Sequence, residues 1–447
     1  MVELPMQLPD RLLLREVSPR DKERLGELLA AVHASPEGIP NASVGRWQRD
    51  LFDRGHPTLT PEQMLVVEDS SKGVLVSAFT MIPQTWSYAG VPIGVSLLEL
   101  AATHPDYRGK NLLRKQLDVL TARSEARGDL LQGMTDVLFF QPGDIGYQMA
   151  ITQRAGRGGT TRNLPLAEPG EEPVKLRPAR LEDIPMLATI DAHARQRSLL
   201  SCVRDESQWR HELRGRSPDS MVHSPILIIE EPSGSVGFLV MGYGGIPSFP
   251  IPTWRPGLPC PEAVVSISRY ELLPGTSWFA VTSSVLRQLT GARGHEEGYM
   301  LWLGEEHPAY DVLGDALTRR PPSMGWFLRV PRWVPLLQRL KPVLEQRLVG
   351  TAGQAFTGEL CLHFYRQGVR IRFVDGKVST IEPWPEFSRR TADVSLPDTL
   401  LMQLLFGHGT WRELAPAYPD SRLQTDRAAL LLPLLFPKLS SNIWPLI

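Results

Sequence analysis

A short basic loop joins an apolar segment to a helical pattern, and this combination is suited to binding phosphate. The loop contains Arg108, Gly109 and Lys110; the apolar segment Val95–Ala102 precedes it, and leucines at helical spacing follow as far as Gly128. N–H groups at a helix N-terminus lack partners within their helix, and the helix dipole favours an anion there. The pattern therefore predicts strand, loop and helix, with a pyrophosphate as the natural ligand.

The apolar segment contains a single charged residue, Glu99. A lone carboxylate in a central strand is costly to bury unless it is paired or serves a function. Two interpretations follow from the sequence: a general base, or one half of a structural ion pair.

The composition excludes several classes of protein. The 447 residues include 48 basic and 49 acidic side chains, with 42% hydrophobic and 22% charged residues, as in ordinary globular proteins. The near-zero net charge argues against nucleic acid as the main partner. The three cysteines, Cys202, Cys260 and Cys361, are too few and too scattered for a disulfide scaffold or a cysteine-rich zinc module, so we expect a reducing compartment.

We expect a soluble, cytoplasmic protein without a metal. The N-terminus does not resemble a signal peptide, and the longest apolar stretch, Ala428–Phe436, is interrupted by Pro433 and is far shorter than the ~20 residues that span a bilayer. The histidines show no HExxH or paired spacing.

Two regions rich in glycine and proline predict domain boundaries. The first covers residues 157–173 and the second residues 320–331. We therefore expect three domains, at residues 1–160, 172–325 and 332–447.

The first two segments share an internal repeat. Leu14, Arg15, Asp21, Leu25 and Leu28 recur at one constant offset, as Leu176, Arg177, Asp183, Leu187 and Ile190. Each copy continues into a predicted hairpin, with strands at 64–67 and 74–81 in the first and at 226–229 and 236–241 in the second. We interpret the pattern as a duplication.

The third segment predicts a small sheet covered by helices. Alternating apolar residues at 360–364 and 369–373 indicate two strands, Asp375-Gly376 indicates a turn, and the leucines after Pro397 indicate a helix that ends at Gly407. The expected class for the whole chain is α/β (α+β).

The residues from Thr103 to Lys110 resemble the coenzyme A loop of the GCN5-related N-acetyltransferase (GNAT) superfamily. Asn111 and Leu113 depart from the family pattern, at the positions of its first glycine and of its second small residue. The Leu112-Leu113-Arg114 sequence and the three-segment layout resemble the enhanced-intracellular-survival (Eis) branch. That branch has two tandem GNAT-like domains and a small sterol-carrier-like domain.

This resemblance implies acetyl-CoA as the co-substrate. It implies that the cofactor-binding residues are Ala101, Ala102, Thr103, Arg108, Gly109, Lys110, Asn111, Leu112, Leu113 and Arg114. The second copy has no basic residue after Glu271-Leu272-Leu273, which we align with Glu99-Leu100-Ala101. We therefore expect the second GNAT-like domain to be degenerate.

The resemblance also implies the acid–base residues. Tyr147, the only tyrosine between Tyr107 and Tyr243, inherits by position the role of protonating the thiolate. The base is an acidic residue on the apolar strand, here Glu99, or the terminal carboxylate that the Eis branch uses, here that of Ile447. The apolar ending of the chain is suited to folding inward.

The expected activity is acetyl transfer to a primary amine of a small molecule or a lysine side chain. Direct attack in a ternary complex is favoured because the first predicted domain contains no cysteine. The alternative is a non-catalytic coenzyme A- or lipid-binding carrier, favoured by Asn111. The resemblance further implies a homo-oligomer, such as a hexamer.

Overall fold

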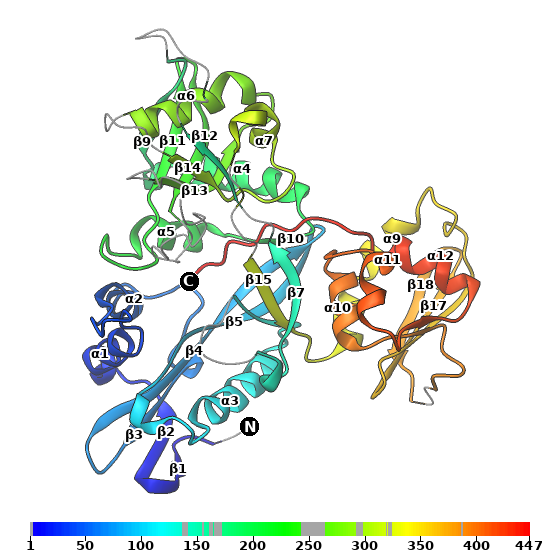
Figure 1. Cartoon of the computed structure of the whole chain (residues 1–447), viewed down its shortest axis with the longest axis horizontal. Coiled ribbons are helices and arrows are strands. Elements are labelled where there is room, and N and C mark those ends of the chain that lie inside the picture. Colours follow the sequence, from blue (N-terminus) through cyan, green and yellow to red (C-terminus); the bar gives the residue numbers. More distant parts are fainter. Residues whose placement is uncertain are drawn as a thin grey trace.

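The chain folds into three β-sheets with helices packed against them, which confirms the predicted mixed α/β class. The computed structural model describes residues 3–135, 142–153, 156–160, 164, 172–242, 264–291, 298–318, 320, 324–385 and 388–447. Figure 1 shows the three parts side by side, with the second at the top and the third at the right. Much of the first predicted boundary region, residues 321–323 of the second, the predicted strand at 137–140, Cys260 and Tyr243 lie outside the described residues.

The first sheet contains the predicted strand, loop and helix. Its described strands lie in the order β1-β2-β3-β4-β5-β6-β15-β7, and β10 also pairs with β4. Their bounds are β1 (Met6–Leu8), β2 (Leu12–Glu16), β3 (Met64–Asp69), β4 (Val74–Tyr88), β5 (Val91–Thr103), β6 (Leu131–Met134), β7 (Gln148–Gln153), β10 (Leu200–Cys202) and β15 (Met324–Arg329). Helices α1 (Lys22–Val32) and α2 (Ala42–Asp53) pack on one face of the sheet, and α3 (Leu112–Arg127) packs on the other.

The second sheet has the described strand order β8-β14-β13-β12-β11-β9. The strands are β8 (Arg157–Thr160), β9 (Lys175–Pro178), β11 (Ile226–Glu231), β12 (Gly234–Met241), β13 (Val264–Leu272) and β14 (Gly298–Leu301). Its helices are α4 (Ile184–Ala194), α5 (Glu206–Arg214), α6 (Trp278–Gly291) and α7 (Pro308–Leu313).

The third sheet has the described order β18-β17-β16-β19-β20. The strands are β16 (Gly358–His363), β17 (Gly368–Val374), β18 (Lys377–Pro383), β19 (Val394–Ser395) and β20 (Arg422–Leu423). The helices are α8 (Trp333–Arg339), α9 (Lys341–Leu348), α10 (Asp398–Leu405), α11 (Trp411–Leu414) and α12 (Asp426–Leu435). The predicted strands, turn and helix of this segment are present, and Asp375 and Gly376 both have the positive φ of a tight hairpin turn.

Three short strands pair with sheets formed mainly by other segments of the chain. Strand β8 precedes the predicted boundary at residue 160 but pairs with β14 in the second sheet. Strand β10 pairs with β4, and β15 lies between β6 and β7. Unpaired strand edges expose N–H and C=O groups, so each insertion satisfies hydrogen bonds that its sheet would otherwise leave open. The domain boundaries themselves stay a prediction.

The offset of the sequence repeat recurs in the secondary structure. Helices α1 and α4 begin and end at this same offset, as do strands β3 and β11. The registers agree as well: Leu14 is opposite Val67 in the first sheet, and Leu176 is opposite Ile229 in the second.

A partly buried arginine pairs with two acids at the start of the repeat in both sheets. Arg15 forms ion pairs with Asp21 at 2.7 Å and with Glu68 at 2.6 Å, which connects β2 to the start of α1 and to β3. The same contacts recur at Arg177, Asp183 and Glu230. The sequence repeat at Arg15 and Asp21 therefore corresponds to a repeated physical interaction.

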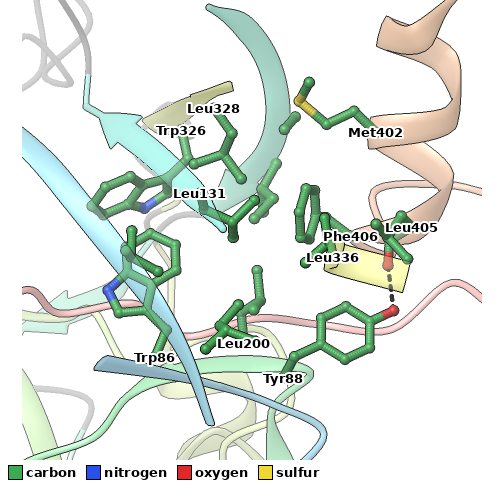
Figure 2. Close-up of a cluster of buried hydrophobic side chains, with 14 of the residues drawn as sticks. Trp86, Tyr88, Leu131, Leu200, Trp326, Leu328, Leu336, Met402, Leu405 and Phe406 are labelled. Carbon is green, nitrogen blue, oxygen red and sulfur yellow. Dashed lines mark hydrogen bonds between the residues drawn. The ribbon is translucent and has the colours of Figure 1, made fainter. Parts of the chain in front are cut away.

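A single hydrophobic cluster connects the first and third sheets (Figure 2). Trp86 of β4 contacts Trp326 of β15 edge to face, with ring centroids 5.3 Å apart. The Tyr88 hydroxyl donates a hydrogen bond to the Leu405 carbonyl at 2.7 Å, and Phe406 packs against the Tyr88 ring. The two sheets therefore share one core.

Replacing Trp326 with Ala should destabilise the folded chain by about 3–5 kcal/mol, because a buried aromatic side chain would leave a cavity. Urea unfolding followed by circular dichroism measures this loss. Phe279→Ala is the control, since Phe279 is 78% exposed and its loss should change stability little. Equal losses in the two variants would contradict the shared core.

Candidate functional site

Strands β5 and β6 separate at the point where the predicted site begins. Their parallel pairing ends at Leu97 and Gly133, whereas β5 stays paired with β4 as far as Thr103. Leu100 has a φ of 52°, in a β-bulge that interrupts the β4 register. In the described part of the sheet, the end of β5 therefore has one edge without a strand partner, where backbone groups are available to a ligand.

The loop after β5 adopts the left-handed turn that the basic motif requires. Gly109 has a φ of 78°, and Asn111, the N-cap of α3, has a φ of 57°. Asparagine tolerates this conformation better than most residues, so Asn111 is compatible with the turn. No described side chain caps the helix, and the first helical N–H groups, from Leu112 onward, remain available to an anion.

The basic side chains of the loop differ in whether an acidic side chain already pairs with them. Arg108 is exposed and makes no ion pair with a described residue. Lys110 forms an ion pair with Asp10, and Arg114 one with Asp118 at 3.0 Å. Arg108 is therefore the cation best placed for a phosphate, and Lys110 must share its charge with Asp10.

The small residues at the end of β5 are fixed by hydrogen bonds. The Ser77 hydroxyl contacts the Ala102 carbonyl at 2.9 Å and the Gln116 amide oxygen at 2.7 Å, which connects β4, β5 and α3. The ring of His33, at the end of α1, contacts the Ala101 carbonyl at 3.2 Å. Neither His33 nor Gln116 stands out in the sequence, because each lies outside the motif that identified the loop.

Glu99 lies on β5 opposite Thr80, beside the bulge, and is partly buried. No described residue forms a hydrogen bond or an ion pair with its carboxyl group, so the described contacts do not support the ion-pair interpretation. Burial raises the pKa of Glu99 to about 8. A carboxyl group with such a pKa can exchange a proton near neutral pH.

Tyr147 lies on the α3 face, in the same hydrophobic cluster as Leu98 of β5 and Leu112 of α3. Its hydroxyl donates to the Gln132 side-chain oxygen at 3.2 Å, and Arg329 of β15 donates to the same oxygen at 2.8 Å. Burial raises the pKa of Tyr147 well above its ordinary value, so the phenol keeps its proton. Arg329 is far from Tyr147 in the sequence, and the motif gave no indication of it.

The last residues of the chain fold inward, as their apolar character predicts. Ile447 is 7% exposed. The Gln84 side chain of β4 donates a hydrogen bond to the Leu446 carbonyl, and Arg204 donates one to the Trp444 carbonyl at 2.6 Å. The tail therefore lies between the first sheet and the second part of the chain, as Figure 1 also shows.

The tail and Glu99 contact different stretches of the β4–β5 hairpin. Gln84 is paired with Val95, and Thr80 with Glu99, so the two positions are four residues apart along each strand. At ~3.4 Å per residue this is roughly 14 Å. The structure thus brings together the loop, the end of β5 and Tyr147, and places the tail at a neighbouring position.

The second sheet has a different charge at the position of Glu99. Arg269 of β13 is opposite Val240 of β12. When the β4–β5 and β12–β13 hairpins are superposed by their register, Val240 corresponds to Thr80 and Arg269 corresponds to Glu99. Glu271 is opposite Phe238 and so corresponds to Ala102 rather than to Glu99. The sequence alignment of Glu271 with Glu99 is therefore displaced, by two residues on β13 and by three on β5, because the bulges differ.

Glu99→Gln should stabilise the chain increasingly as the pH rises. The folded protein holds this proton more tightly than the unfolded chain, so wild-type stability should fall as the pH rises from about 4.5 to about 8. Thermal unfolding across this range should show a growing advantage in Tm for the variant. Glu27→Gln, at an exposed site on α1, should show none. A difference in Tm between Glu99→Gln and the wild type that does not vary with pH would contradict a buried carboxyl group without a partner among the described residues.

Residues 14–135 match the family model described as an acetyltransferase (GNAT) domain. No curated protein matches the sequence. Among the described residues, no helix is both long and apolar enough to cross a membrane.

Solved structures resemble the chain over nearly its whole length. A GCN5-related N-acetyltransferase from Kribbella flavida has 15% identity and a TM-score of 0.63, covering 97% of this chain and 98% of its own. One from Anabaena variabilis has 12% identity and a TM-score of 0.65, covering 97% and 99%. Eis1 from Mycobacterium abscessus has 14% identity and a TM-score of 0.57, also covering 97% and 99%. The chain therefore shares the overall fold of these proteins, and its residues 14–135 are similar to the acetyltransferase (GNAT) domain.

Proposed function

We propose that the protein is an acetyl-CoA-dependent N-acetyltransferase that acts on a primary amine of a small molecule or a lysine side chain. The observation that carries the proposal is the separation of β5 and β6 next to the uncapped N-terminus of α3. This geometry lies within the segment that matches the acetyltransferase family model.

The residues of the loop fit the pyrophosphate of coenzyme A. Gly109 and Asn111 shape a turn that exposes backbone N–H groups, and the first turn of α3, from Leu112 to Arg114, offers further donors. Arg108, which no described acid pairs with, supplies positive charge, and the open edge of β5 at Ala101–Thr103 supplies backbone groups for the remainder of the co-substrate. The loop therefore offers complementary charge and hydrogen-bond donors.

The raised pKa values of Glu99 and Tyr147 suit acyl transfer by direct attack in a ternary complex. When bound, acetyl-CoA supplies the acetyl group as a thioester. The ionised form of Glu99, which its raised pKa of about 8 makes increasingly populated as the pH approaches 8, accepts a proton from the attacking amine, directly or through water. Tyr147 keeps its proton and donates it to the departing sulfur, while Gln132 and Arg329 hold the phenol in place.

The Ile447 carboxylate is the alternative base. Its support is the burial of the tail against Gln84 on the same hairpin as Glu99. Glu99 is the stronger candidate because its pKa is raised toward the pH at which a base works best, and because it lies beside the open edge of β5.

We further propose that the second sheet belongs to a degenerate GNAT-like domain and the third to a sterol-carrier-like domain, with the three domains at 1–160, 172–325 and 332–447. The repeated elements and ion pairs support the duplication. Arg269, at the position of Glu99, pairs with Asp191 and lies 3.5 Å from Glu212, so a charge network occupies the place of a base.

The alternative is a carrier that binds coenzyme A or a lipid without catalysis. A cavity of about 330 Å³ beside α8 and β18 is lined by a mixture of polar and apolar residues, among them Gln338, Lys341, Thr380 and Ile381. An acyl chain requires a mainly apolar lining, so this cavity gives little support to lipid binding. Thermal shifts with coenzyme A, acetyl-CoA and a fatty acid separate the two functions.

Replacing Arg108 and Lys110 together with Ala should weaken coenzyme A binding by about 2–4 kcal/mol, because charge-assisted hydrogen bonds contribute about 1.5–3 kcal/mol each and neighbours are not additive. Arg108→Ala alone should account for most of the loss, since Lys110 is paired with Asp10. Asp10→Asn should strengthen binding by freeing Lys110. Calorimetry measures all three variants, and unchanged affinity in the double variant would exclude the phosphate loop.

Glu99→Gln should lower kcat by about 10²–10⁴-fold, the usual contribution of a general base, and leave coenzyme A affinity unchanged. Adding one or two glycines after Ile447 should reduce kcat much less. Steady-state rates with any amine that is turned over provide the measurement. The reverse pattern would assign the base to the tail, and no effect in either variant would exclude both groups.

A further inference from the structure

A small cavity lies between the second sheet and the tail, away from the loop of the candidate site. Its volume is about 20 Å³, and its lining includes Arg204, Glu212, Arg216, Arg269, Trp444 and Ile447. Arg204 and Arg269 are 7% and 8% exposed. A volume above ~10–15 Å³ admits one occupant of about the size of water, so the cavity has space for a single small guest.

Arg216 reaches this cavity with unsatisfied donors. One terminal nitrogen, Nη1, donates to the Val222 carbonyl at 3.2 Å. Its Nε and Nη2 are buried and have no hydrogen-bond partner in the described structure. Burying a guanidinium group with unpaired donors is costly, and such groups require a ligand or an ordered water. Burial also lowers the pKa of Arg216.

Positive charge exceeds negative charge around the cavity. Arg204 pairs with Glu212 at 2.9 Å, and Arg269 pairs with Asp191, whose other oxygen is occupied by Arg195. The lining therefore holds three arginines, Arg204, Arg216 and Arg269, against Glu212 and the terminal carboxylate of Ile447, so positive charge exceeds negative charge by one. The described residues form no ion pair within 4.0 Å with the carboxyl end of Ile447.

The cavity lies in the second copy of the repeat at the position that corresponds to Glu99 in the first. Arg269 and Val240, which both line it, correspond by strand register to Glu99 and Thr80 of the first sheet. The same position therefore holds an acid without a described partner in one copy and clustered arginines in the other. The side chain at this position is acidic in the first sheet and basic in the second, so in the second sheet the position favours an anionic ligand.

We propose that this cavity binds one monovalent anion of the size of chloride, held by Arg216 together with Arg204 and Arg269. A phosphate or a sulfate is too large for the volume, and a neutral water molecule would leave the positive charge uncompensated. The anion would fix the tail against the second sheet, because Arg204 also donates to the Trp444 carbonyl.

The first experiment compares thermal unfolding of the full chain in sodium chloride and in sodium gluconate at equal ionic strength. Chloride should raise Tm saturably, by roughly 1–3 °C, and Arg216→Gln should abolish the rise. The matched control is Arg210→Gln, which removes an exposed arginine that pairs with Glu206 on α5 and should keep the wild-type response. An equal chloride response in the Arg216→Gln variant would overturn the proposal.

A second measurement does not depend on the folding of a variant. Crystals of the wild-type chain grown in sodium bromide should show an anomalous peak among the guanidinium groups of Arg204, Arg216 and Arg269. A water molecule there, or the carboxyl group of Ile447 in direct contact with Arg216, would overturn the proposal.

Discussion

The arrangement of the first and third sheets depends on the burial of one aromatic and aliphatic cluster. Trp86 of β4, Trp326 of β15 and Phe406 after α10 come from segments that are remote in sequence, yet they share one core (Figure 2). Burial of apolar area is the dominant favourable term in folding, and each large aromatic side chain contributes a large share per residue. The cluster also holds β15 in the first sheet, which brings Arg329 to the Gln132 amide next to Tyr147.

Buried charge distinguishes the two copies of the repeat. In the first sheet Glu99 is partly buried without a described partner, and its pKa is raised; this costs stability and provides a group that can exchange a proton. In the second sheet Arg269 pairs with acids on α4 and α5 and also lines the cavity beside the tail. The same backbone position therefore holds an acid without a described partner in one copy and an arginine of a charge network in the other.

Local patterns predicted much of the fold and of the site. The strand, loop and helix around Arg108 to Asn111 form as their apolar periodicity and turn residues indicate, and Asn111 takes a left-handed conformation. The alignment of Glu271 with Glu99 was wrong, by two residues on β13 and by three on β5, because a β-bulge shifts register without changing the sequence pattern. A pattern of residue types does not reveal where a strand adds an unpaired residue.

The sequence by itself determined the elements, the turn at Gly109 to Asn111 and the inward folding of the apolar tail, because backbone conformation and hydrophobic periodicity are encoded within a few neighbouring residues. Only the tertiary structure decided which distant groups meet. It placed β10 and β15 in the first sheet, brought Gln132 and Arg329 to Tyr147, and left two donors of Arg216 without a described partner beside the tail. Such contacts depend on the packing of strands and side chains from remote segments, whose register and burial no local pattern specifies.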